Sequence, residues 1–303
     1  MATMTETPET TLSQKNEPPS HEFHAEAHVL SGHLQRPIEQ KIEQHAPVAL
    51  KGRRSGHLTR LIEDVSIEGL ISFKTGLTRV SGSKSLKHHG WVTLSTSIME
   101  GLNAFEVITA DRMVSQVSTE HPLENGHFPH VTFLGTQFNN LRVSGFPVTL
   151  TLNFGICGKK PEGDKSYLRD ADFLKSVRKQ TESIVKADGL PKDMKDQYDE
   201  RLARINELIE GKNGSHEPKV ICSIVESIDK IPIPGVRSFG HVLVIPDFGT
   251  VSLGEIEIGE KKYDPTGRPS NYFELTTIKM QLGCIGTGTV TAGTVAANGH
   301  TRP

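Results

Sequence analysis

The sequence has few cysteines and no long hydrophobic run. Its three cysteines, Cys157, Cys222 and Cys284, lie far apart and form no C-x-x-C pair, so a disulfide framework or a zinc knuckle is not expected. No apolar stretch reaches the roughly 18 residues that a membrane-spanning helix needs. The N-terminal segment carries acidic charge and no apolar core, unlike a signal peptide. These absences predict a cytoplasmic protein with no membrane partner.

Neither sign of charge is in excess. The chain has 34 Lys and Arg against 36 Asp and Glu, and a formal net charge of -2. Nucleic acids are bound through clustered positive charge. The one short basic cluster, residues 51–54 (KGRR), has neighbouring glycines that are typical of a solvated loop. We therefore expect no nucleic-acid partner.

Common catalytic motifs are also missing. The sequence has no G-x-S-x-G nucleophile elbow and no G-x-x-x-x-G-K-[ST] phosphate-binding loop. No sequence motif therefore identifies a catalytic residue or a cofactor. This pattern favours a non-enzymatic role.

Most of the chain is predicted to form short β-strands. In residues 21–160 and 217–284, segments rich in Val, Ile, Thr and Phe alternate with Gly, Pro and Asn. Residues 147–154 (PVTLTLNF) show the period-two alternation of a strand with one buried face. The spacing of these segments predicts a mainly β fold, either an antiparallel β-sandwich or a barrel.

Residues 161–216 interrupt this pattern with dense charge and helical spacing. Gly189 and Pro191 mark a turn between two helices. The apolar stripe of the first helix is Leu174, Val177, Thr181 and Ile184. The stripe of the second helix is Tyr198, Leu202, Ile205 and Ile209. We predict an inserted αα-hairpin whose second stripe packs on the β-body or binds a partner, either a second copy or another protein.

Both ends of the chain have compositions typical of disorder. Residues 1–20 are rich in Thr, Glu, Pro and Ser. Residues 285–303 are rich in Gly, Thr and Ala and carry one charged residue, Arg302. We predict a disordered tail at each end.

Histidines concentrate in residues 21–33 (HEFHAEAHVLSGH). In a strand, alternate side chains share a face, so His24, Glu26 and His28 point away from the apolar face of Phe23, Ala25 and Ala27. One interpretation is a solvated outer face. The alternative is a site for Zn²⁺, Fe²⁺ or Mn²⁺, as on the strands of cupin-like enzymes. The sequence favours the solvated face, because no defined later histidine completes the cupin pattern.

A second histidine group lies in residues 121–130 (HPLENGHFPH). It contains His121, Glu124, His127 and His130. The two prolines and the Asn-Gly pair predict a turn-rich loop, which holds metal ligands poorly. We interpret this segment as an ordinary hairpin connection.

Two strings in the β-rich region resemble a known group of sequences. Residues 100–122 (EGLNAFEVITADRMVSQVSTEHP) and 138–148 (FNNLRVSGFPV) are similar to a functionally uncharacterised bacterial protein family. The resemblance implies no particular fold, activity or site.

The preferred hypothesis for function is a non-enzymatic binding or assembly protein that uses its β-surface or its helical hairpin. One alternative is a metal-dependent, cupin-like enzyme that uses His24, Glu26 and His28. A second alternative is a carbohydrate-binding sandwich. Sugar binding is disfavoured because Trp91 is the only tryptophan and the chain has four tyrosines to stack on sugars.

Overall fold

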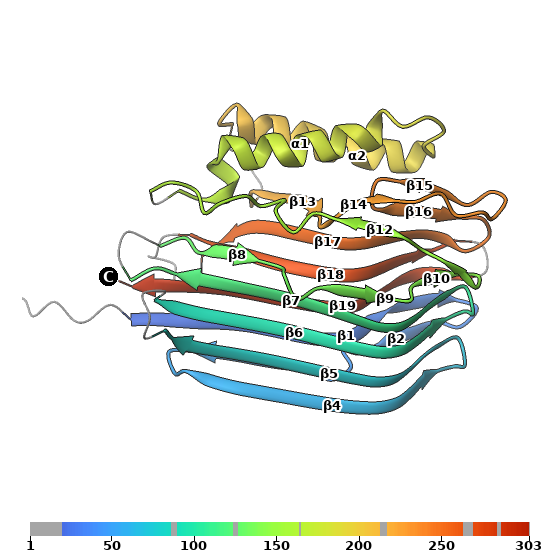
Figure 1. Cartoon of the computed structure of the whole chain (residues 1–303), viewed down its shortest axis with the longest axis horizontal. Helices are drawn as coiled ribbons and strands as arrows, with labels where there is room; N and C mark the ends of the chain where they lie inside the picture. Colours follow the sequence, from blue (N-terminus) through green and yellow to red (C-terminus); the bar gives the residue numbers. More distant parts are fainter. Residues whose placement is uncertain are drawn as a thin grey trace, which may run out of the picture.

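In the computed structural model, two antiparallel β-sheets pack on each other, and two helices lie along one edge of the stack (Figure 1). The structure describes residues 20–85, 90–123, 127–163, 165–212, 217–262, 269–283 and 286–302. The predicted N-terminal tail, residues 1–20, lies outside them except for Ser20, which begins the first strand. The predicted class is confirmed, and the sandwich is the observed one of the two predicted architectures.

The larger sheet has nine strands. Its order is β15 (Arg237–Phe239), β16 (Val242–Ile245), β17 (Gly249–Lys261), β18 (Ser270–Leu282), β19 (Thr287–Arg302), β1 (Ser20–Arg36) and β2 (Gln40–Ile42). Two further strands complete it: β13 (Lys219–Ser223) pairs with β17, and β3 (Val48–Gly52) pairs with β1.

The smaller sheet has eight strands. Its order is β11 (Phe146–Pro147), β10 (Arg142–Val143), β7 (Ile108–His121), β6 (Trp91–Ala104), β5 (Ile71–Lys84) and β4 (Gly56–Ile67). The strands β8 (His130–Thr132) and β9 (Gln137–Asn139) also pair with β7. A separate ladder joins β12 (Leu150–Leu152) to β14 (Val225–Ile228).

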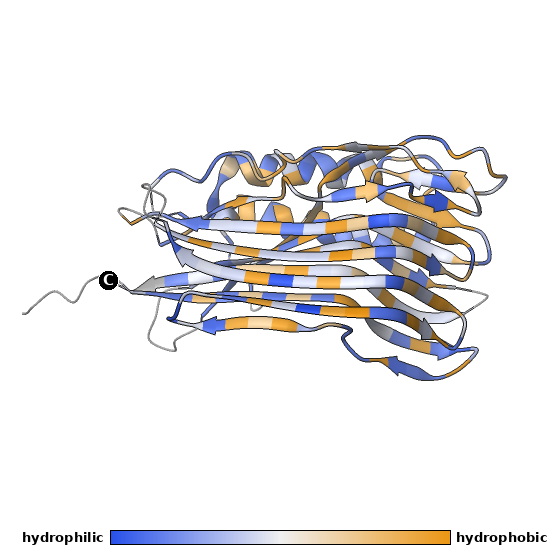
Figure 2. Ribbon diagram, turned by 60° about the horizontal axis from the view of Figure 1, so that its bottom comes forward, coloured by the Kyte–Doolittle hydropathy of each residue, from blue (hydrophilic) through white to orange (hydrophobic). Residues whose placement is uncertain are grey.

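The core lies between the two sheets, where β1 and β19 face β5, β6 and β7. Figure 2 shows hydrophilic and hydrophobic residues alternating along the strands, as expected when one face of each strand is buried. In β1, Phe23, Ala25 and Ala27 are buried, and Glu26 on the opposite face is exposed. The predicted alternation in this strand is confirmed.

β19 shows that the prediction of a disordered tail over residues 285–303 is wrong. This strand lies between β18 and β1 and pairs with both along most of its length. Its inward side chains are small and fully buried: Val290, Ala292, Val295 and Ala297. The facing strand β7 comes close enough for the Ser115 hydroxyl to donate a hydrogen bond to the Gly293 carbonyl. A segment rich in Gly, Thr and Ala can therefore form a central strand, because its small side chains allow the second sheet to pack closely on it.

The inserted helical pair begins with a short 3-10 helix, η1 (Tyr167–Arg169), and continues with α1 (Ala171–Val185) and α2 (Lys192–Ile209). The Asp170 carboxylate accepts a hydrogen bond from the Phe173 amide and so caps α1. The predicted stripe of α1 is buried. The hairpin packs on β13 at the top edge of the stack in Figure 1. Neither α1 nor α2 has the length and apolar composition of a membrane span.

Candidate functional site

A group of possible metal ligands lies where β1 begins and β19 ends. In the β1–β19 ladder, Glu22 is paired with His300, and His24 is paired with Asn298. Cross-strand partners share a face, as do residues two apart in one strand, so Glu22, His24 and His300 gather on the outer face of the sheet. Their ligand atoms all lie within 4.8 Å of one another. The His300 Nε2 atom is 3.6 Å from Glu22 Oε2, and His300 is only 5% exposed.

The surroundings of this group hold its side chains in place. The Arg53 Nε atom donates a hydrogen bond of 3.2 Å to Glu22 Oε1. The rings of His24 and His300 are nearly parallel, with centroids 6.2 Å apart. Burial lowers the pKa of His24, and the neighbouring His300 lowers it further. A neutral imidazole is the form that binds a metal ion.

The three candidates predicted from the sequence share one face but do not converge. Glu26 forms an ion pair of 2.6 Å with Lys51 of β3. The His28 Nε2 atom lies 2.9 Å from the Ser31 hydroxyl. Of the three, His24 belongs to the ligand group found among the described residues.

Sequence reasoning missed the two other members of the group. Glu22 lies in the histidine-rich stretch, but its partner lies almost 280 positions later in the chain. That partner, His300, falls in the segment that composition predicts to be a tail. A prediction of β19 and of its register would have found the site.

On the inner face at the same end of the sandwich, two histidines are buried. The ring of His21 stacks on Trp91 at 5.3 Å and lies 4.5 Å from the ring of His121. The His121 Nε2 atom is 3.0 Å from the Gly299 carbonyl oxygen. Burial lowers the pKa of His21 to about 3, and that of His121 well below its usual value. Both imidazoles are therefore neutral and serve packing in this region.

His121 and Trp91 are both buried at this end of the sandwich. His121 is the last residue of β7 and is fully buried, so the prediction that it lies in an ordinary loop is wrong. Glu124, from the same histidine group, lies outside the described residues. Trp91 is buried beneath His21, so its ring is not exposed for stacking on a ligand.

Beneath the hairpin, a buried carboxylate joins α2 to the larger sheet. The Arg201 Nη1 atom donates a 3.1 Å hydrogen bond to Glu255 Oε1, and Lys279 Nζ lies 3.7 Å from Oε2. The Tyr198 hydroxyl is 3.2 Å from His241 Nε2. Burial raises the pKa of Glu255, but His241, Arg201 and Lys279 outweigh it and lower that pKa to about 2. This ionised, fully partnered carboxylate fixes the hairpin on β17.

The second predicted stripe is largely used by the chain's own core. Tyr198 and Ile205 are buried, and Leu202 is half-buried. Ile209 is 39% exposed, because Leu208 takes the inward position at this end of α2. Of the two predicted roles of the stripe, packing on the β-body therefore does not extend to Ile209.

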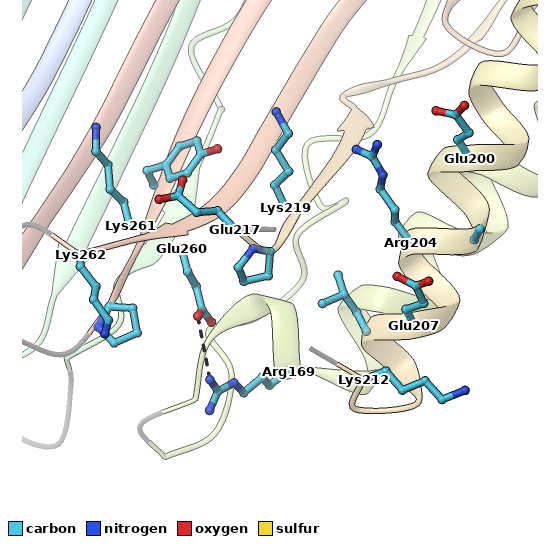
Figure 3. A pocket seen from close by; sticks show the side chains of 15 residues that line it. Arg169, Glu200, Arg204, Glu207, Lys212, Glu217, Lys219, Glu260, Lys261 and Lys262 are labelled. Carbon is cyan, nitrogen blue, oxygen red and sulfur yellow. Dashed lines mark ion pairs between the residues drawn. The ribbon is translucent and has the colours of Figure 1, made fainter. Parts of the chain in front are cut away.

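A large cleft opens between α2, β13, β17 and η1 (Figure 3). Its volume is about 1210 Å³. The basic side chains on its walls are Arg169, Arg204, Lys212, Lys219, Lys261 and Lys262, and the acidic ones are Glu200, Glu207, Glu217 and Glu260. Arg169 and Glu260 approach to 3.9 Å. Because the described walls carry both signs, they do not create a single-sign field that would select an anion or a cation.

The opposite edge of the sandwich ends in the strand β4. It has 12 residues and, within the described part of the chain, pairs only with β5. Leu61 is 59% exposed and Leu58 is 44% exposed. The strand therefore presents apolar side chains beside an edge that lacks a strand neighbour in the described chain.

The comparisons with known proteins identify a family but no function. The family described as Domain of unknown function (DUF8256) matches residues 21–259, which is well over half of the chain. No curated protein and no solved structure matches significantly. The strands β18 and β19, including His300, lie beyond the matched range. The chain belongs to the DUF8256 family, whose function is unknown.

Proposed function

We propose that this protein is a non-enzymatic assembly protein that pairs with a second copy of itself through the edge of β4. The observation that carries the proposal is the length and exposure of this strand. An edge strand offers a row of backbone donors and acceptors to another strand. Within the described chain, β4 combines such an edge with the exposed side chains of Leu58 and Leu61.

Other outermost strands of the two sheets are short. The strands β15 and β2 have three residues each, and β11 has two. Short edge strands are a common protection against unwanted pairing. The length of β4 therefore supports an edge retained for pairing.

The sequence of β4 suits antiparallel pairing with itself. In a register centred on Leu61, the two Leu61 side chains lie opposite each other. Arg60 then faces Ile62, and Thr59 faces Glu63, so no like charges are directly opposite across this segment. Such a twofold contact uses the same surface on both copies, as most homodimers do, and cross-strand apolar pairs stabilise it.

The test is the molar mass of the full chain, measured by size-exclusion chromatography with light scattering over a range of concentrations. We expect a dimer for the wild type and a monomer for Leu61→Asp, because this change places two carboxylates opposite each other. Leu134→Asp is the matched control, since Leu134 is 73% exposed and lies outside β4. This variant should remain dimeric. A monomeric wild type, or an unchanged mass for Leu61→Asp, would contradict the proposal.

A further inference from the structure

We infer that Glu22, His24 and His300 bind one divalent transition-metal ion, with Zn²⁺ as the best match, between the strands β1 and β19. The inference rests on the convergence of these three side chains on one face of the sheet. It does not depend on self-association through β4, because the two surfaces involve different strands.

The distances suit a metal ion with nitrogen and oxygen ligands. With metal–ligand bonds of about 2.0–2.2 Å, tetrahedral zinc separates its ligand atoms by roughly 3.3–3.5 Å. The His300 Nε2 and Glu22 Oε2 atoms are already 3.6 Å apart, and all three ligand atoms lie within 4.8 Å. These separations are close to those of a bound ion, so binding requires the ligand atoms to move together by about 1 Å.

The two strands hold the ligands on a regular backbone. The β1–β19 pairing runs without a break from Ser20 opposite Arg302 to His28 opposite Thr294. Ligands placed on strands are held more precisely than ligands on loops. His300 is buried and His24 is half-buried, so an ion bound here would be partly shielded from water.

The ligand set selects the class of metal. Two imidazoles and one carboxylate suit Zn²⁺ and other transition metals, whereas Ca²⁺ and Mg²⁺ require mainly oxygen ligands. Arg53 donates to Glu22 Oε1, and Oε2 is the oxygen that lies near His300. The guanidinium thus orients the carboxylate. Its positive charge also opposes the ion, so we expect micromolar rather than nanomolar affinity.

The test is titration of the purified full chain with ZnCl₂ by calorimetry, together with the visible absorption of the Co²⁺-loaded protein. We expect one ion per chain in the wild type. His24→Ala should weaken binding at least tenfold and abolish the Co²⁺ absorption bands. His28→Ala is the matched control, because His28 is also half-buried on the outer face of β1 but lies outside the ligand group. It should bind like the wild type.

A second variant and a check of folding distinguish loss of a metal ligand from loss of the fold. Glu22→Gln preserves the shape of the side chain and should also weaken binding, while far-ultraviolet circular dichroism of each variant should match the wild type. Zn²⁺ should raise the melting temperature of the wild type and of His28→Ala, but not that of His24→Ala. Leu61→Asp should still bind the ion. No binding by the wild type, unchanged binding by His24→Ala, or equal losses in His24→Ala and His28→Ala would overturn the inference.

Discussion

The two edges of the sandwich are completed in different ways. At the top edge in Figure 1, the helical hairpin covers β13 and is fixed to β17 through Arg201 and Glu255. At the bottom edge, β4 lies beyond β5 with Leu61 largely exposed. The chain thus uses an insertion of two helices to cover one edge and leaves a long strand at the other. Within the described chain, one edge is covered by an insertion, whereas the other ends in a strand with a neighbour on one side only.

The largest loss of stability is expected when the buried carboxylate beneath the hairpin is removed. Glu255→Ala removes the carboxylate and leaves Arg201 and Lys279 without their partner, which should lower the free energy of unfolding by about 3–5 kcal/mol. Urea denaturation measures this change. Glu200→Ala, on the exposed wall of the cleft, should change it by no more than about 0.5 kcal/mol. Equal effects of the two variants would mean that the buried carboxylate does not fix the hairpin.

Truncating a buried apolar side chain of α2 should cause the next largest loss of stability. Ile205 is buried against the core, so Ile205→Ala should destabilise the protein by about 3 kcal/mol through lost contacts and a cavity. Ile209→Ala is the control one turn later in α2, and it should have little effect because Ile209 is exposed. Thermal and urea unfolding would both report the difference. A larger loss for Ile209→Ala would contradict the observed helix face.

Stability measured over a range of pH distinguishes the contribution of the buried histidines, His21 and His121, from that of Glu255 beneath the hairpin. Burial lowers the pKa of His21 to about 3 and that of His121 well below 6.5, so the unfolded chain binds protons that the folded chain excludes. The free energy of unfolding should therefore fall as the pH drops below about 6.5, and His21 alone should account for about 2 kcal/mol of this loss at pH 5. The folded pKa of Glu255 is lowered from 4.5 to about 2, so its contribution is lost only below about pH 4.5.

The measurement is urea unfolding at pH 7 and at pH 5. His121→Gln keeps a side chain that can hydrogen-bond but removes one titrating group, so its stability should depend less on pH than that of the wild type. If wild-type stability is the same at both pH values, these imidazoles do not remain neutral in the folded chain.

The smallest effect is expected in the hydrogen exchange of β4, the strand at the bottom edge. Pairing of β4 with a second copy should slow hydrogen exchange of its backbone amides as the protein concentration rises, by about tenfold across the dimerisation range. The amides of β17, which has strand neighbours on both sides, should exchange at rates that do not depend on concentration. Mass spectrometry of deuterated peptides compares the two strands in one sample. Concentration-independent exchange in β4 would argue against its pairing.

The helical hairpin and the fold class could be predicted from local patterns. Leu174, Val177 and Ile184 recur at the helical period, and the structure buries all three. Near the end of α2, Leu208 rather than Ile209 packs against the core, because the period does not fix which residue faces inward at a helix end. The alternation of buried and outward-facing residues in β1 could also be predicted, since a strand with one buried face repeats every two residues.

The candidate metal site could not be predicted, because it depends on a pairing between distant segments. Local sequence indicates that His24 faces outward, but the identity of its neighbours depends on which strand lies next to β1 and in which register. The small residues of β19 gave no hydrophobic signal, so His300 was assigned to a tail. Glu26 is two residues from His24, as Glu22 is, but it lies opposite Ala296 rather than His300 and forms an ion pair with Lys51.

The position of β19 also has a consequence for the order of folding. During synthesis, β1 leaves the ribosome before every other described strand, and β19 follows all of them. Yet β19 separates β1 from β18 in the finished sheet. The pairs between β1 and β19 can therefore form only after residues 287–302 have been synthesised, and pairing between such distant segments is in general a slow step of folding.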